Sequence, residues 1–202
     1  TFLHTGSTQA GTVHSGGIMI ISGTKDTVEF EDVVFRYGRG QIGGAVLVLV
    51  NPGTVKFGPG TVFEENRAER YGGALAILSS ADVRLEGVSF RNNSAESGGA
   101  IAMLPKSEVK IKDDGINNLK IWKLEEIGQA EWTRSKLNAK NASFFKDHTD
   151  ADKIGGFGGA IYMMESDIEI SDSVFTACHT DDFGWGGAFR FLSSDVKIIG
   201  TV

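Results

Sequence analysis

Short apolar segments return along the chain at nearly regular intervals, at residues 45–50, 74–78, 100–104, 160–164 and 188–192. Each is followed by a segment in which apolar and polar residues alternate, such as Val55-Lys56-Phe57, and then by one that ends on phenylalanine. Alternation with a period of two is typical of β-strands, and the missing 3.6-residue period disfavours helical repeats. Three short strands can bury their apolar faces only if successive repeats stack. The pattern predicts an all-β fold, a right-handed parallel β-helix solenoid of about six to seven coils.

Aligning the repeats places similar residues in columns. In the first strand the second and fourth positions are large and apolar, so both columns should point into the coil, because alternate residues share a face. They read Val46, Leu75, Ile101, Ile161, Phe189 and Val48, Ile77, Met103, Met163, Phe191. The position between them is expected to face outward and reads Leu47, Ala76, Ala102, Tyr162, Arg190. The next strand has a charged outward column of Glu29, Lys56, Arg84, Lys110, Glu169 and Lys197, with opposite charges stacked at its first and last steps.

Each apolar strand is preceded by a pair of glycines. The first glycine of each pair is Gly16, Gly43, Gly72, Gly98, Gly158 or Gly186, at spacings of 27, 29, 26, 60 and 28 residues. Glycine reaches the positive φ values that a sharp bend between sheets requires. We interpret these glycines as structural turn residues. The 60-residue spacing holds either one repeat with about thirty extra residues or two repeats of which one is erased.

The third strand of each repeat ends on a phenylalanine that we expect to fill the interior, namely Phe35, Phe63, Phe90, Phe145 or Phe175. In two repeats an asparagine follows three residues later, as Phe63-x-x-Asn66 and Phe90-x-x-Asn93. Asparagine tolerates a left-handed conformation and bonds nearby backbone. Repeated in successive coils, it can also form a hydrogen-bonded ladder.

These two tetrapeptides resemble the repeats of the chlamydial polymorphic outer membrane protein family. The first stands here as Gly43-Gly44-Ala45-Val46 and again at residues 72–75, 98–101, 158–161 and, relaxed, 186–189. The second is intact at residues 63–66 and 90–93 and degenerate after Phe35, Phe145 and Phe175. The resemblance covers nearly the whole chain outside the insertion. It implies a secreted or surface-exposed, adhesin-like module.

The repeat is interrupted by an insertion at residues 115–140, which contains Trp122 and Trp132 and favours a helix over residues 124–137. Solenoids place such excursions on one face, often the binding face. Two interpretations stay open for the tryptophans. Either they pack against the outside of the coils, or they dock a partner, because tryptophan is enriched at the energetic centres of interfaces.

Composition narrows the function classes. The chain has 27 Gly against 3 Pro and a formal net charge of −6, which argues against a nucleic-acid partner. No apolar run reaches the ~20 residues of a transmembrane helix. Cys178 is the only cysteine, so the chain cannot form an internal disulfide. We expect no cofactor.

Several polar groups are candidates for chemistry. Carboxylates cluster at Asp113-Asp114, Asp150/Asp152 and Asp181-Asp182, and paired carboxylates can hydrolyse glycosides or bind Ca²⁺. His148 and His179 follow equivalent phenylalanines and could bind a metal with Asp147 or Asp181. Because aspartate also favours glycine-rich turns, we interpret the clusters as turn residues. We interpret Cys178 as an inert thiol. The outer apolar residues Ile20, Leu47 and Val50 are a further candidate binding surface.

These observations favour a non-catalytic β-helical structural or adhesin-like module, outside the cell or on its surface, that presents loops to a protein or glycan. One alternative is a structural subunit of a larger assembly, for which a lumenal location is also possible. The other is a carbohydrate-active enzyme. We expect residues 1–202 to form one β-helix domain of a longer chain or assembly, with its coil ends capped by further chain or another subunit, because open ends expose unpaired backbone.

Overall fold

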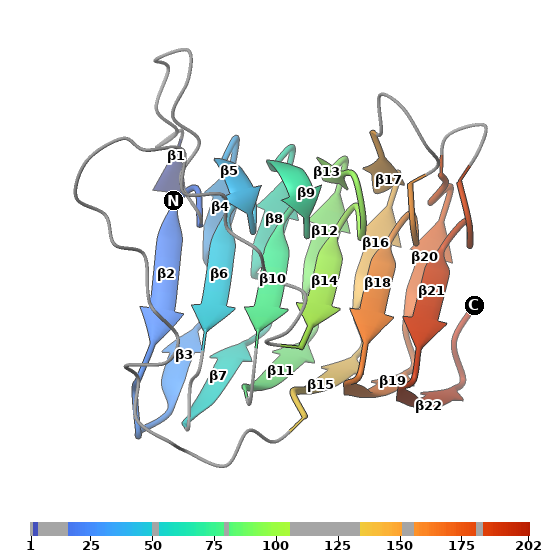
Figure 1. Ribbon diagram of the computed structural model, residues 1–202. Helices are drawn as coiled ribbons and strands as arrows, with labels where there is room; N and C mark the ends of the chain where they lie inside the picture. Colours follow the sequence, from blue (N-terminus) through green and yellow to red (C-terminus); the bar gives the residue numbers. More distant parts are fainter. Residues whose placement is uncertain are drawn as a thin grey trace.

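A computed structural model describes residues 2–3, 16–49, 53–78, 81–105, 134–150, 156–180 and 184–202. All the secondary structure of these residues is β-strand. Every strand pair is parallel, and each strand is paired with the equivalent strands of the neighbouring coils. The described residues contain no helix, and therefore none that could span a membrane. The predicted all-β parallel solenoid is confirmed (Figure 1).

Four parallel sheets run along the stack. The strand that follows each glycine pair belongs to sheet B, the next strand to sheet C, the phenylalanine strand to sheet A, and the short strand before the next glycine pair to sheet D. Sheet B contains β2 (Met19–Ser22), β6 (Val46–Leu49), β10 (Leu75–Leu78), β14 (Ile101–Leu104), β18 (Ile161–Met164) and β21 (Phe189–Leu192). Sheet C contains β3 (Val28–Phe30), β7 (Thr54–Phe57), β11 (Asp82–Glu86), β15 (Lys136–Lys140), β19 (Asp167–Ser171) and β22 (Asp195–Ile199). Sheet A contains β1 (Phe2–Leu3), β4 (Val34–Arg36), β8 (Val62–Glu64), β12 (Ser89–Arg91), β16 (Ser143–Phe145) and β20 (Val174–Thr176). Sheet D contains β5 (Arg39–Ile42), β9 (Arg67–Tyr71), β13 (Ser94–Ala95) and β17 (His148–Thr149).

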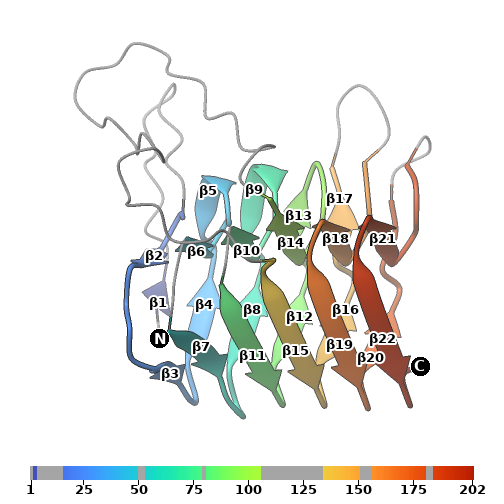
Figure 2. The same ribbon diagram turned by 60° about the horizontal axis from the view of Figure 1, so that its bottom comes forward.

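The winding is right-handed. In Figure 1 the chain descends the near sheet B, crosses below along sheet C and rises in the far sheet A while it advances from left to right. Sheets A, B and C each contain six strands. Five complete turns therefore separate β2 from β21, slightly fewer than the six to seven coils expected. Figure 2 brings sheet C to the front, with its strands side by side along the stack.

The fourth coil continues across the insertion. Strand β14 ends at Leu104, and β15 begins at Lys136 and pairs in register with β11 on one side and β19 on the other. The 60-residue spacing thus holds one coil with extra residues between sheets B and C. Residues 136–140, at the end of the expected 115–140 insertion, belong to the stack. The expected helix lies outside the described residues except at its end, where Leu137 is in β15.

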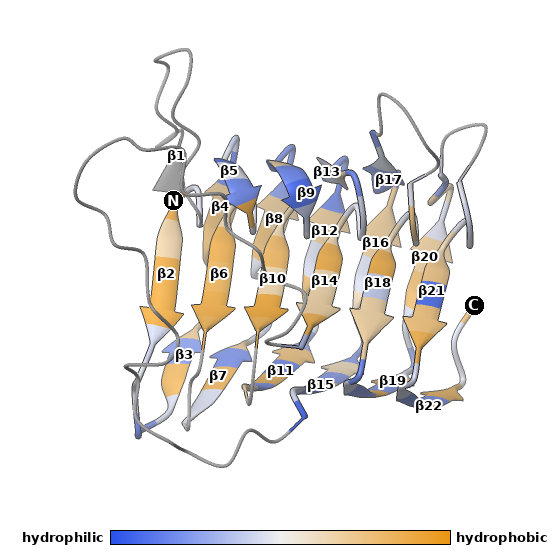
Figure 3. Cartoon of the chain, viewed as in Figure 1, coloured by the Kyte–Doolittle hydropathy of each residue, from blue (hydrophilic) through white to orange (hydrophobic). Residues whose placement is uncertain are grey.

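The interior is built from the expected columns. The second and fourth positions of sheet B pair in register and lie in one buried apolar core. Next to them, the phenylalanines of sheet A stack face to face, with ring centroids 4.3–4.9 Å apart between Phe35, Phe63, Phe90, Phe144 and Phe175. Figure 3 shows the strands of sheet B as mostly apolar and those of sheet C as alternating between apolar and polar residues.

Two sequence alignments in the fourth coil are wrong. Phe144 pairs with Phe90 and is buried, whereas Phe145 points outward and is 40% exposed. In the outward column of sheet C, the residue between Arg84 and Glu169 is Asn138 rather than Lys110, which lies outside the described residues. The expected charge pairs at the two ends of that column are present, from Lys56 to Glu29 at 3.8 Å and from Lys197 to Glu169 at 2.7 Å.

Candidate functional site

The two glycines of each pair meet different constraints. The first, exemplified by Gly98, has a φ of +67°, and a Cβ there would collide with the carbonyl oxygen of Ile101. Gly16, Gly43, Gly72, Gly158 and Gly186 likewise have positive φ. The second glycine lies against the next coil, so that a Cβ on Gly99 would collide with the carbonyl oxygen of Gly159. The pair therefore occupies a turn where backbone stacks directly on backbone.

A ladder of buried amides runs along the turn between sheets A and D. The Asn66 Nδ2 group donates to the Phe35 carbonyl at 3.0 Å and to Asn93 Oδ1 at 3.0 Å, while Asn66 Oδ1 accepts from the Gly38 amide at 2.8 Å. Asn93 repeats the pattern, because its Nδ2 donates to the Phe63 carbonyl at 3.0 Å. Each side chain thereby joins three successive coils.

The left-handed residue of this turn is the one before the ladder position, rather than the asparagine itself. It is Tyr37, Glu65, Asn92, Lys146 or Ala177, each with a φ between 52° and 61°. The asparagines are thus selected for the polar atoms that they present to neighbouring coils. In the fourth coil the left-handed residue is Lys146, two residues after Phe144, which agrees with the corrected register.

Asp147 is the ladder residue that the sequence alignment missed. Its Oδ1 accepts from the Asn93 amide and from Asn93 Nδ2, both at 2.9 Å, and its side chain is fully buried. Its Oδ2 is buried without a hydrogen-bond partner. Burial raises the pKa of Asp147 to about 7, although the two donors of Asn93 and a backbone hydrogen bond with Phe145 oppose that shift. The signal was available, because with Phe144 in the column both His148 and His179 follow their phenylalanine by four residues.

The structure brings the two candidate metal-binding histidines together on the outside of this turn. The His148 and His179 rings stack with centroids 5.4 Å apart, and the two residues are paired across adjacent coils. The Nδ1 atom of each ring faces a backbone carbonyl at 3.2 Å, that of Lys146 and of Ala177 respectively. No group of three metal-ligating side chains occurs within the described ranges. The pair is thus a stacked surface contact in this geometry.

Cys178 occupies the ladder position of the next coil. Its thiol is half-buried and donates to the Thr176 carbonyl at 3.7 Å. Burial, with the nearby Asp147 charge as a smaller cause, raises the pKa of this thiol to about 11. A thiol with so high a pKa stays protonated at neutral pH and is a weak nucleophile.

The candidate carboxylate clusters fall mainly outside the described residues. This applies to Asp113, Asp114, Asp152, Asp181 and Asp182. Asp150 is described, and its Oδ2 lies 2.7 Å from the Arg67 guanidinium two coils away. That contact makes Asp150 part of a surface ion pair.

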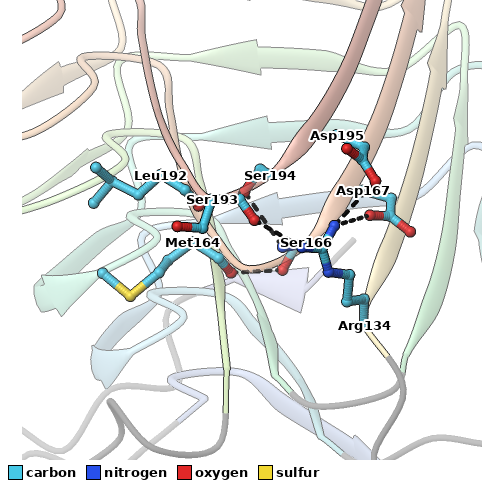
Figure 4. Close-up of polar contacts among 8 residues, drawn as sticks. All are labelled: Arg134, Met164, Ser166, Asp167, Leu192, Ser193, Ser194 and Asp195. Carbon is cyan, nitrogen blue, oxygen red and sulfur yellow. Dashed lines mark hydrogen bonds and ion pairs between the residues drawn. The ribbon is translucent and has the colours of Figure 1, made fainter.

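Arg134, just before β15, binds residues of the two following coils (Figure 4). Its Nη1 lies 3.1 Å from Asp167 Oδ1 and 3.0 Å from Asp195 Oδ2, and its Nη2 donates to the Ser193 carbonyl at 3.0 Å. A single guanidinium therefore connects the fourth coil to the fifth and sixth. Beside it, the Ser166 amide donates to Ser194 Oγ at 3.3 Å, which joins the same two later coils.

The outer side of sheet B differs from expectation. The outward column is buried rather than exposed from Leu47, at 3% exposure, to Tyr162, at 6%, and half-buried at Arg190. These side chains form a second apolar cluster that consists of Ile42, Leu47, Leu49, Ala76, Leu78, Leu104 and Tyr162. Of the candidate surface Ile20, Leu47 and Val50, only Ile20 is exposed among the described residues, and Val50 lies outside them.

An aromatic group adjoins this second cluster. Tyr162 stacks between Tyr71 and Phe157, and the Arg190 guanidinium lies 4.1 Å from the Phe157 ring centroid and 4.8 Å from that of Trp185. The other two tryptophans, the candidate partner-binding residues Trp122 and Trp132, lie outside the described residues.

Comparison with known proteins identifies the repeat. Residues 87–102 match the Chlamydia polymorphic membrane protein repeat. The matched segment covers part of one coil, from Phe90 and Asn93 of the ladder to the Gly98–Gly99 pair. No curated protein and no solved structure matches the chain. The repeat and the parallel solenoid agree with the resemblance drawn from the sequence, and together they indicate a structural module of the surface-protein type.

Proposed function

We propose that this chain is a non-catalytic β-helical module of a secreted or cell-surface protein, and that it presents its inserted segment to a protein or glycan partner. The observation that carries the proposal is the anchoring of that segment. Its two ends lie in a regular stack, and Arg134 ties its return to the two following coils. A rigid base lowers the entropic cost of binding through the segment that it holds. Trp122 and Trp132 supply residue types enriched at interface centres.

The non-catalytic part of the proposal rests on how the described polar groups are used. The Asp150, Asp167, Asp195 and Glu169 carboxylates are in ion pairs at the surface. Asp147 has a perturbed pKa of the kind seen in catalytic acids, but it is fully buried in the ladder and so cannot reach a substrate.

Binding tests the proposal directly. The full chain would be applied to an array of immobilised glycans and to cultured epithelial cells, beside a variant in which residues 107–132 are replaced by a short Gly-Ser linker. Residues 151–155 replaced in the same way provide the control. We expect saturable binding by the full chain and the control, and at least tenfold weaker binding by the deletion variant, with the β-sheet circular dichroism unchanged.

Two results would count against the proposal. Undiminished binding by the deletion variant, whether or not its melting temperature falls, would leave the insertion without a docking role. Release of new reducing ends or unsaturated products from polysaccharides by the full chain would instead establish the carbohydrate-active alternative.

A further inference from the structure

The carboxyl of Asp147 has the shape of the ladder amides, but where an amide has two N–H protons it has one when neutral and none when ionised. In Asn66 and Asn93, Nδ2 donates to the carbonyl of the preceding coil's phenylalanine, at 3.0 Å in both cases. Phe35, Phe63 and Phe90 are in register, so the Phe90 carbonyl is the equivalent acceptor for the fourth coil. Asp147 Oδ1 takes the place of the amide oxygen and accepts both donors of Asn93. Its Oδ2 therefore stands where the amide nitrogen would be.

An ionised carboxyl cannot complete this arrangement. Oδ2 would then present a lone pair to a carbonyl oxygen, and both atoms are acceptors. The unpartnered state of Oδ2 is the expected result, and a buried acceptor without a donor is costly. A neutral carboxyl has one O–H donor and removes both the conflict and the buried charge.

The surroundings of Asp147 supply no buried cation to hold it ionised. The preceding coil contributes the neutral Asn93. The next coil contributes Cys178, a thiol that donates to the Thr176 carbonyl, and the exposed His179. Its own coil contributes a backbone hydrogen bond with Phe145, which favours the ionised form less than burial opposes it. It also contributes His148 and Lys146, whose Nζ lies 5.1 Å from the exposed Phe145 ring on the outer surface.

We propose that Asp147 is a proton-dependent link between coils, in which the neutral side chain donates from Oδ2 to the Phe90 carbonyl and ionisation breaks that bond. The proton passes to solvent when the link opens. The pKa of about 7 places this change at neutral pH.

The direction of the pH effect follows from the raised pKa. Between the ordinary aspartate value of 3.8 and about 7, the folded chain holds a proton that the unfolded chain has lost. The stability that Asp147 contributes is therefore fully present below about pH 4 and decreases as the pH rises to about 7. Because one proton is involved, the folding equilibrium constant decreases by up to tenfold for each unit that the pH rises in this range.

Asp147→Asn tests the link, because it supplies the missing donor without a change of shape. Urea unfolding of the natural chain and the variant would be compared at pH 5, 6, 7 and 8. Asp150→Asn makes the same chemical change at the surface and is the control. At pH 8 we expect Asp147→Asn to be more stable than the natural chain. Between pH 8 and pH 5 the ratio of the variant's folding equilibrium constant to that of the natural chain should fall at least tenfold. The control should show no such convergence.

A second readout separates protonation from a purely steric effect. The carbon-13 NMR shift of the Asp147 carboxyl should titrate near neutral pH. A carboxyl that titrates near pH 4, or an Asp147→Asn difference that is the same at pH 5 and pH 8, would overturn the proposal. A variant less stable than the natural chain at pH 8 would overturn it as well.

Discussion

At the scale of single residues, the chain uses polar and small side chains where an ordinary core would use apolar ones. Asn66, Asn93 and Asp147 are fully buried because each satisfies backbone groups of neighbouring coils. Removing one such side chain would leave several buried groups without partners, each at a cost of ~1–3 kcal/mol. The ladder therefore contributes to the spacing of the coils as well as to the local turn.

The second glycine of the pair gives a residue-scale prediction with a matched control. In Gly99→Ala the added methyl would collide with backbone of the next coil, at the Gly159 carbonyl and at the amide of His148. At Gly187 the nearest atom to an added Cβ is the Cys178 carbonyl oxygen at 3.9 Å. Overpacking typically costs ~1–3 kcal/mol. We expect Gly99→Ala to lose at least ~2 kcal/mol in urea unfolding and Gly187→Ala less than ~1 kcal/mol; equal losses would contradict the role of coil-to-coil contact.

At the scale of the strand, repetition made most of the fold predictable. The sheet B columns repeat without interruption, so their register could be read from the sequence. The fourth coil could not be aligned as safely, because its sheet A strand contains two adjacent phenylalanines and the insertion precedes it. Nor did the sequence indicate that the outward residues Leu47 and Tyr162 are buried, since a strand pattern specifies the side a residue faces and not what covers it.

The two adjacent phenylalanines provide a test at the same scale. Phe144 stacks between Phe90 and Phe175, at 4.8 and 4.3 Å, whereas Phe145 is partly exposed. Truncation of a buried phenylalanine costs ~3–5 kcal/mol. Phe144→Ala should lose stability in that range in denaturant titration, and Phe145→Ala less than ~1 kcal/mol. A larger loss for Phe145→Ala than for Phe144→Ala would instead support the register in which Phe145 fills the interior.

At the scale of the whole molecule, the chain is a stack in which strand pairing joins each coil only to its neighbours, while a few surface ion pairs reach two coils away, as between Arg67 and Asp150. Stability of such a stack is a sum of coil and interface terms, and it tolerates long excursions between strands. Strand β14 ends at Leu104, and the fourth coil resumes at its regular place in β15, which pairs in register with β11 and β19. Function is the part that could be predicted least, because the repeat explains the architecture while the candidate binding residues Trp122 and Trp132 lie in the segment that departs from it.

The continuity of the stack across the insertion is tested most directly by nuclear Overhauser effects between backbone protons of sheet C. In the parallel register, Arg84 lies beside Asn138, and Asn138 beside Glu169. We predict cross-strand signals that connect Arg84 with Asn138 and Asn138 with Glu169 in the folded chain. Signals that instead join Arg84 to residues around Lys110 would contradict the account, because β15 would then not be the strand that continues the solenoid.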